Sequence, residues 1–232
     1  MFDFLMNVLK SEYDICRELR NTDRCRICLL RHRESGSLYI LRHYHSAGEA
    51  YEKLREIRCP HIPEVYETAR KEDEVLVLEE YIQGDSLRLL LEAGPLTQKQ
   101  TKDIILQLCD ALWVIHRLGL VHRDIKPENI ILRGNEAFLI DFDATRVHKP
   151  DKRADTQVLG TIGYAAPEQF GFSQTDKRAD IYSLGVLMNT MLTGKHPSII
   201  MPPGKWGFII RRCTMTNPQQ RFSNVRMIQA IL

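Results

Sequence analysis

The chain has almost no excess charge of either sign. Its 32 Lys+Arg and 30 Asp+Glu leave a formal net charge of +2 over 232 residues, so no global field recruits nucleic acid or an acidic membrane. No apolar run approaches the roughly 20 residues that a membrane span needs. The apolar residues 1–9 include Asp3 and lack the basic start and cleavage site of a signal peptide, so we expect a short packing helix there.

The sequence also lacks internal repeats and low-complexity tracts. Apolar residues make up 44% of it and charged residues 27%, which excludes disorder, collagen and a coiled coil. The length suits one globular domain, 1–232, and we expect two lobes at about 12–82 and 83–232.

Cysteines are few and scattered, which excludes a secreted disulfide scaffold and leads us to expect reduced thiols and a cytoplasmic location. Cys25 and Cys28 have the spacing of a zinc-binding pair, but no second pair follows them. His43 and His45 are the nearest further candidates. Because a structural zinc site needs four ligands, we favour a strand over a zinc site for this segment.

Strand-like patterns fill the first third of the chain. Short apolar runs at 26–30, 38–41 and 75–78 are bounded by turn-forming residues, and Gly36 provides a turn between the first two. A helical stretch at about 47–57 interrupts them.

The pattern then becomes helical. Thr97 and Gln100 form a capping box, the apolar residues of 104–118 recur with the helical period, and Gly119 ends the helix. We expect a hairpin joining 130–132 to 137–140.

A second apolar helix is expected at 181–192, ending at Gly194. A small, mostly β lobe thus precedes a larger helical lobe, which defines an α+β fold.

A polar segment, His122-Arg-Asp-Ile-Lys-Pro-Glu-Asn129, stands between the long helix and the hairpin. Asn129 and Asp141 supply oxygen ligands at the two ends of the hairpin, which suits Mg²⁺. Asp124 is a carboxylate that can accept a hydroxyl proton, and Lys126 is a cation that can neutralise a transferring phosphoryl group.

These eight residues, followed by Asp141 after a further twelve, resemble the catalytic loop and metal motif of eukaryotic-type protein kinases. Residues 160–168 look like the end of an activation segment. Residues 180–185 look like the start of the central helix, and 217–221 like the late motif whose arginine pairs with a glutamate. The stretch 159–169 is similar to bacterial serine/threonine kinases in particular.

The resemblance implies supporting roles for several residues. Asp180 braces the backbone of the catalytic loop, and His122 is a core histidine that steadies it. The Thr161 hydroxyl contacts Asp124 and Lys126. Arg221 is expected to pair with Glu168, and the docking helix usual after Gly194 to be reduced.

The implied activity is transfer of the γ-phosphate of ATP, with Mg²⁺, to Ser/Thr hydroxyls of a protein substrate, and Lys126 favours Ser/Thr over tyrosine. Nucleic acid is not an expected partner. A pseudokinase, a kinase-fold binding or regulatory module with little or no activity, is the alternative. A small-molecule kinase is a third reading, which the protein-substrate platform of residues 160–168 disfavours.

The first lobe departs from the family at its nucleotide-binding positions. Residues 19–27, at the position of the glycine-rich loop, contain no glycine, and Arg42 replaces the third-strand lysine. In the family a small residue usually covers the adenine, and Ile40 falls at that position. Glu79 falls at the position called the gatekeeper, just before the segment that connects the lobes, where an apolar residue is usual. By the same alignment Arg42, Glu80 and Ile82 are expected to contact the nucleotide.

Two further departures concern the helix and the metal motif. In the family a helix glutamate pairs with the lysine. The corresponding position in this chain is Ala50, or Glu49 or Glu52 beside it. Asp143 replaces the glycine that normally ends the metal motif. Because Asp124, Lys126, Asn129 and Asp141 are all retained, an enzyme is favoured over a pseudokinase.

The activation segment contains one candidate regulatory site, Thr156. Arg123 precedes the catalytic aspartate, and in the family such an arginine binds a phosphate on that segment. Thr156 lies in a polar stretch near Lys149, Lys152 and Arg153, and a phosphate there could pair with Arg123. The alternative, an unmodified loop residue, is equally compatible with the sequence.

Overall fold

The computed structural model describes residues 1–45, 49–147, 161, 163–171 and 175–232. The chain divides into two compact units, one of residues 1–59 and 63–82, the other of residues 60–62 and 83–232. In the described part of the chain, no helix combines the length and the apolar character that crossing a membrane requires.

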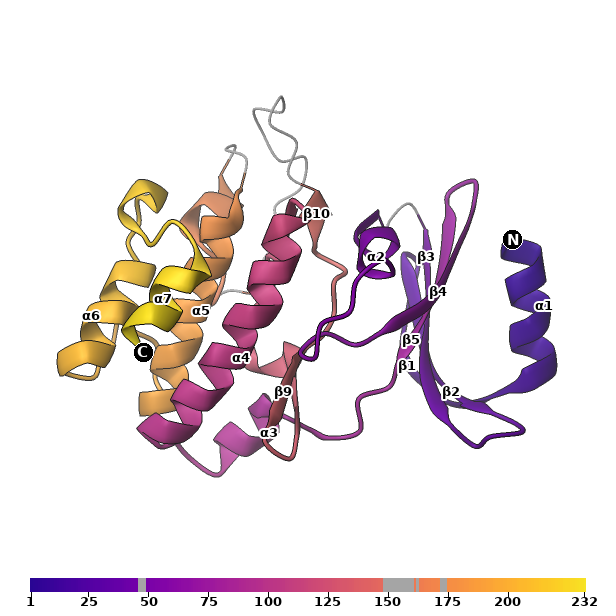
Figure 1. Ribbon diagram of the computed structural model, residues 1–232, viewed down its shortest axis with the longest axis horizontal. Coiled ribbons are helices and arrows are strands. Elements are labelled where there is room, and N and C mark those ends of the chain that lie inside the picture. The colour runs from indigo at the N-terminus through magenta and orange to yellow at the C-terminus, as the bar shows by residue number, and fades with distance from the viewer. Residues whose placement is uncertain (46–48, 148–160, 162, 172–174) are drawn as a thin grey trace. The chain divides into compact units, whose positions relative to one another are not determined.

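The first unit is a five-stranded antiparallel sheet with a helix on each face (Figure 1). The strand order is β1-β2-β3-β5-β4. The elements are α1 (Phe2–Glu12), β1 (Tyr13–Thr22), β2 (Cys25–His32), β3 (Leu38–His45), α2 (Glu49–Leu54), β4 (Val65–Lys71) and β5 (Glu74–Glu80). The three predicted strands and the N-terminal packing helix are confirmed, and the second helix is confirmed over 49–54, residues 46–48 lying outside the described residues.

Helix α1 covers one face of this sheet. Its side chains Phe2, Leu5 and Leu9 are buried against apolar residues of the strands, among them Leu30 and Leu76. The three positions recur every three or four residues, so they form one helical stripe. Burial of this stripe fixes α1 on the sheet.

The β1–β2 hairpin includes residues 19–27, the position of the glycine-rich loop in the kinase pattern. Asp23 and Arg24 form its turn. The Thr22 hydroxyl accepts a hydrogen bond from the Cys25 N–H at 3.2 Å and donates one to the Cys25 carbonyl at 3.1 Å. A side chain therefore stabilises this turn by hydrogen bonds to the backbone, and the turn contains no glycine. Cys25 and Cys28 lie in β2, as the strand interpretation predicts.

The second unit is mostly helical. Its helices are α3 (Leu87–Glu92), α4 (Gln98–Arg117), α5 (Lys177–Thr193), α6 (Gly204–Cys213) and α7 (Val225–Ile231). Short 3-10 turns occur at Pro127–Asn129, Pro167–Phe170 and Pro218–Gln220. Strands β6 (Asp85–Ser86), β8 (Ile130–Arg133) and β9 (Glu136–Leu139) form one small sheet, and β7 (Leu120–Val121) pairs with β10 (Arg146–Val147).

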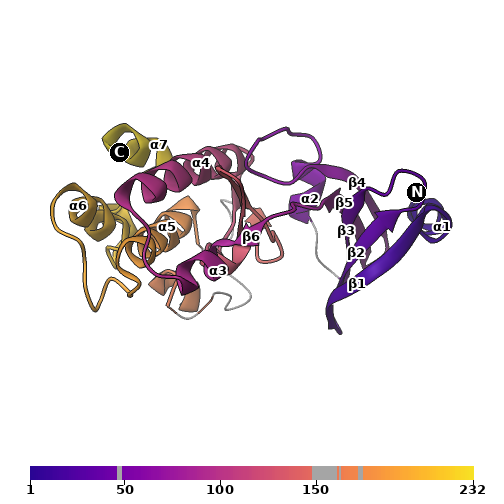
Figure 2. The same ribbon diagram turned by 90° about the horizontal axis from the view of Figure 1, so that it is seen from below.

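Helix α4 is the centre of this unit. It contacts β9 on one side and α5 and α7 on another, and the two views agree on this placement (Figure 1, Figure 2). The Thr97 side chain accepts from the Gln100 N–H at 3.2 Å, and the Gln100 side chain accepts from the Thr97 N–H at 3.0 Å. The predicted capping box is thus confirmed, as are the long helix and the β8–β9 hairpin.

Helix α5 runs through the interior. A Cβ at Gly185 would lie 2.4 Å from the Cys213 Cβ, so glycine is required for α6 to pack this closely. Gly194 ends α5 with φ 68°, the left-handed conformation that the sequence predicts for the helix end. Residues 194–203 contain no helix, in agreement with the expected reduction of the docking helix. Together the sheet-containing unit and the helical unit confirm the α+β fold class.

Candidate active site

In the polar segment after α4, one carboxylate, that of Asp124, contacts three other side chains. Oδ2 of Asp124 lies 2.7 Å from Nζ of Lys126, and Oδ1 accepts from the Thr161 hydroxyl at 2.7 Å. Lys126 Nζ also donates to Thr161 Oγ1 at 2.9 Å. Asn129 Nδ2 donates to Asp124 Oδ2 at 2.9 Å. The structure therefore brings Asp124, Lys126 and Asn129 together and confirms the expected contacts of Thr161.

Asp180, at the start of α5, holds the backbone of this loop. Its two carboxylate oxygens accept from the N–H groups of His122 at 2.9 Å and Arg123 at 2.8 Å. Arg123 has φ 70°, a left-handed conformation that costs energy for a residue with a side chain. The two hydrogen bonds to Asp180 stabilise this conformation. The expected role of Asp180 in holding the loop backbone is therefore confirmed.

The ionised form of Asp180 is maintained inside the protein. Burial alone would raise the pKa of Asp180, but the hydrogen bond from His116, together with smaller contributions that include the Arg123 N–H, outweighs it, so this pKa lies below its ordinary value. His116 Nε2 lies 2.8 Å from Asp180 Oδ2. Sequence reasoning missed His116, although it follows Leu112 by four residues on the buried face of the same helix.

His122 is a buried neutral histidine. Burial lowers its pKa, and the carboxylates of Asp180 and Asp124 oppose that shift without cancelling it. The ring packs edge-on against Phe142 at 5.0 Å between centroids, and its Nε2 lies 3.3 Å from the Ile140 carbonyl. These contacts confirm the predicted structural role of His122.

Asp141 directly follows the hairpin that begins at Asn129. The Ile140 N–H donates to the Asn129 backbone carbonyl at 2.9 Å, which ties the two ends of the hairpin together. Asp141 has φ 65°, and its Oδ1 accepts weakly from the Asp143 N–H at 3.4 Å. Asp143 thus supports the turn in which Asp141 sits.

A buried ion pair closes the end of the activation segment. Glu168 receives two hydrogen bonds from Arg221, at 2.6 and 2.8 Å, and the Arg221 side chain is fully buried. The predicted pairing is confirmed. Gln169, which sequence reasoning missed, donates to the Arg123 carbonyl at 2.9 Å and so connects this segment to the catalytic loop.

In the first unit, Arg42 and Glu79 form a buried ion pair. Arg42 Nε donates to Glu79 Oε1 at 2.6 Å, and the two side chains are only 6% and 5% exposed. Arg42 Nη1 also approaches the Tyr44 hydroxyl at 3.4 Å, and the Tyr44 hydroxyl donates to that of Tyr51 at 3.2 Å. The two departures from the kinase pattern thus neutralise one another.

Helix α2 turns a tyrosine toward Arg42, where the kinase pattern has a glutamate. Glu49 and Glu52 are exposed, and Glu52 pairs with Arg70 at 3.0 Å. The buried Tyr51 ring instead lies 5.7 Å from the Arg42 guanidinium carbon. Of the three alternatives, Ala50 agrees with the structure and the two glutamates do not, because the phase of α2 turns Tyr51 inward together with Ala50 and Leu54.

Three other residues singled out in the sequence are at least partly buried. Glu80 is half-buried at the end of β5, and Ile82 is buried. Arg123 is fully buried. Thr156 lies outside the described residues, so its phosphorylation stays a prediction.

Comparison with known proteins agrees with this geometry. Residues 41–205, well over half of the chain, match the family model for the protein kinase domain. The chain therefore belongs to the protein kinase domain family.

Its relatives include bacterial serine/threonine-protein kinases. The chain is 33% identical to the serine/threonine-protein kinase pkn2 of Myxococcus xanthus. The match covers 69% of this chain and 21% of pkn2. It is 35% identical to PknB and 37% identical to PknD of Mycobacterium tuberculosis, each over 60% of the chain. The chain spans about a fifth to a quarter of the length of these relatives.

Proposed function

We propose that this chain transfers the γ-phosphoryl group of ATP to serine or threonine hydroxyls of proteins. The observation that carries the proposal is the hydrogen-bonded cluster of Asp124, Lys126, Asn129 and Thr161. A carboxylate and an ammonium held 2.7 Å apart provide a proton acceptor and a positive charge at one point. Phosphoryl transfer needs these two groups near the acceptor hydroxyl.

Asp124 orients the acceptor hydroxyl and takes its proton. The hydroxyl oxygen bonds to the γ-phosphorus while the bond from that phosphorus to the bridging oxygen of ADP breaks. Lys126 neutralises charge on the phosphoryl oxygens during the transfer. Thr161 fixes both side chains through its single hydroxyl.

Asn129 and Asp141 fit the requirements of Mg²⁺. The Asn129 amide nitrogen donates to the backbone carbonyl and to Oδ2 of Asp124, at 2.8 and 2.9 Å. Its amide oxygen, together with the Asp141 carboxylate, therefore provides the hard oxygen ligands that Mg²⁺ prefers. When bound, the ion neutralises charge on the nucleotide phosphates.

For the first unit, we propose that Arg42, Glu80 and Ile82 contribute contacts to the nucleotide. Arg42 takes the position of the family lysine, and Glu79 replaces the helix glutamate as its anionic partner. The exchange keeps a charge pair at this position, with both members on strands instead of one on a helix.

The proposal is tested by incubating the purified chain with Mg·ATP and a serine- and threonine-rich test protein. Mass spectrometry should find phosphoserine or phosphothreonine, and chelation of Mg²⁺ should abolish it. Phosphotyrosine alone would contradict the substrate class. Bound nucleotide without transfer would establish the pseudokinase alternative instead.

A further inference from the structure

Three side chains that the proposed phosphotransfer does not use converge on one face of the first unit. His43 and His45 alternate along β3 and so point to the same side of the sheet. Glu74, the first residue of β5, is the direct cross-strand partner of His45. Antiparallel pairing thus places two imidazoles and one carboxylate next to each other.

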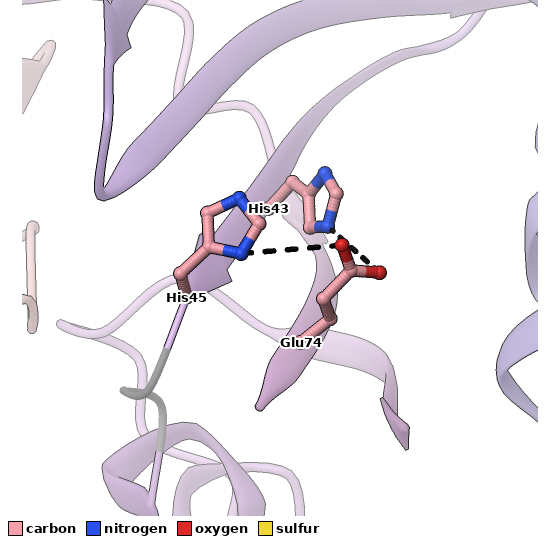
Figure 3. A group of neighbouring side chains, drawn as sticks. All are labelled: His43, His45 and Glu74. Atoms are coloured by element: carbon pink, nitrogen blue, oxygen red, sulfur yellow. Dashed lines mark ion pairs between the residues drawn. The ribbon is translucent and has the colours of Figure 1, made fainter. Parts of the chain in front are cut away.

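The ligand atoms of these residues are close enough to share one ion. One donor atom from each side chain lies within 4.8 Å of the other two. His43 Nε2 is 3.6 Å from Glu74 Oε2, and His45 Nδ1 is 3.9 Å from Glu74 Oε1. Figure 3 shows both rings turned toward the carboxylate. Tetrahedral ligands at ~2.0–2.2 Å from zinc are separated by ~3.4 Å. The two imidazole–carboxylate distances are close to this spacing, and rotation of the side chains must bring the three ligand atoms, now within 4.8 Å of one another, to it.

Among the described residues, the surroundings of His43 restrict its ring and leave one ring nitrogen without a hydrogen bond. Its ring packs against Phe2 of α1 at 6.1 Å between centroids. Within the described part of the chain its Nε2 is buried and makes no hydrogen bond. This nitrogen faces the Glu74 carboxylate at 3.6 Å, too far for a hydrogen bond, and a metal ion between the two would satisfy both.

We propose that His43, His45 and Glu74 bind a divalent transition metal ion, zinc being the best match. Two imidazoles and a carboxylate suit Zn²⁺, whereas Mg²⁺ and Ca²⁺ prefer oxygen ligands alone. The fourth position is open to water, since His45 and Glu74 are about half exposed. Cys25 and Cys28, the pair with zinc spacing in the sequence, do not take part among the described groups.

The position of this site gives the ion a structural effect. It links β3 to β5, the two strands that carry Arg42 and Glu79. His43 is adjacent to Arg42 in β3. A bound ion therefore stabilises the pairing of the strands that hold the buried ion pair.

Calorimetric titration of the metal-free full chain with Zn²⁺ tests the site. We expect one site, and each of His43→Gln, His45→Gln and Glu74→Gln should weaken binding at least about tenfold. Glu72→Gln and Asp73→Asn, in the adjoining turn, are matched controls and should bind as wild type does. Zn²⁺ should raise the melting temperature of the wild type and the controls but not of the three ligand variants.

The ligands are identified independently with Co²⁺. Substitution should give visible d–d bands without a thiolate-to-metal charge-transfer band. A thiolate band that disappears in Cys25→Ser or Cys28→Ser would overturn the proposal, as would no binding to wild type or equal loss in the Glu72→Gln control. His45→Gln is the decisive variant, because its exposed side chain can be replaced without disturbing the core.

Discussion

Arg42 Nε donates to Glu79 Oε1 across 2.6 Å inside the β-sheet unit, with both side chains shielded from water. In the β3–β5 register the direct partner of Arg42 is Val77, and that of Glu79 is Ile40. Arg42 and Glu79 are therefore diagonal neighbours on one face of the sheet. Neither residue alone would be tolerated easily at a buried position, because an isolated buried charge is costly. Arg42 and Glu79 therefore compensate one another at these buried positions, and we expect their contributions to stability to be coupled.

This coupling is measurable with a double-mutant cycle. Arg42→Met and Glu79→Gln should each lower the free energy of unfolding by ~2–4 kcal/mol, and the double variant should lose clearly less than the sum. Urea unfolding provides the values. The exposed pair Arg70–Glu52 is the control, and its cycle should give less than ~1 kcal/mol. Additive losses at Arg42 and Glu79 would disprove the coupling.

Thr161 is expected to position the proposed catalytic pair, Asp124 and Lys126. Thr161→Ala removes the hydroxyl that contacts Asp124 and Lys126, and should lower kcat by ~10- to 100-fold through misorientation. Thr161→Ser keeps the hydroxyl and should restore most of the rate. Steady-state kinetics with both variants decides the point, and equal rates for alanine and serine would contradict it.

Asp141→Asn should abolish the Mg²⁺-dependent part of nucleotide binding. Asparagine tolerates the positive φ of this position, so the melting temperature without ligand should stay within a few degrees of wild type. Thermal shift with Mg·ATP measures the effect, and Asp103→Asn on the exposed face of α4 is the control. An undiminished shift in Asp141→Asn would remove the metal role.

Acidification should destabilise the chain through His122. Burial lowers the pKa of His122 in the folded state, so below the ordinary pKa of ~6.5 the unfolded chain binds a proton that the folded chain does not. Stability therefore falls as pH decreases through this range. Urea unfolding between about pH 7.5 and 5.5 should show a smaller decline for His122→Asn than for wild type. His196→Asn, outside the catalytic loop, should decline as wild type does.

Local patterns explain which features the sequence predicts well. The Thr97–Gln100 capping box and Gly194 mark helix ends with hydrogen bonds or backbone angles that act over a few residues. The residues proposed for catalysis, Asp124 and Lys126, and the proposed metal ligand Asn129 lie in one short loop, so their proximity follows directly from the sequence.

Features that depend on strand register are harder to predict. Arg42 and Glu79 are 37 residues apart, and their pairing depends on how β3 and β5 align. The same register brings Glu74 beside His45, whereas sequence reasoning considered the two histidines only with Cys25 and Cys28. The inward position of Tyr51 likewise depends on the phase of a six-residue helix, too short for its apolar period to be decisive.

The initial rate of phosphate transfer from Mg·ATP by wild type, Asp124→Asn and Asp103→Asn tests the central claim most directly. Asp124→Asn retains the shape of the side chain but removes the proton acceptor, and should lower kcat by at least ~100-fold. Asp103→Asn should leave the rate unchanged. Equal rates for wild type and Asp124→Asn, or no transfer by any of the three, would contradict a phosphotransferase built on Asp124.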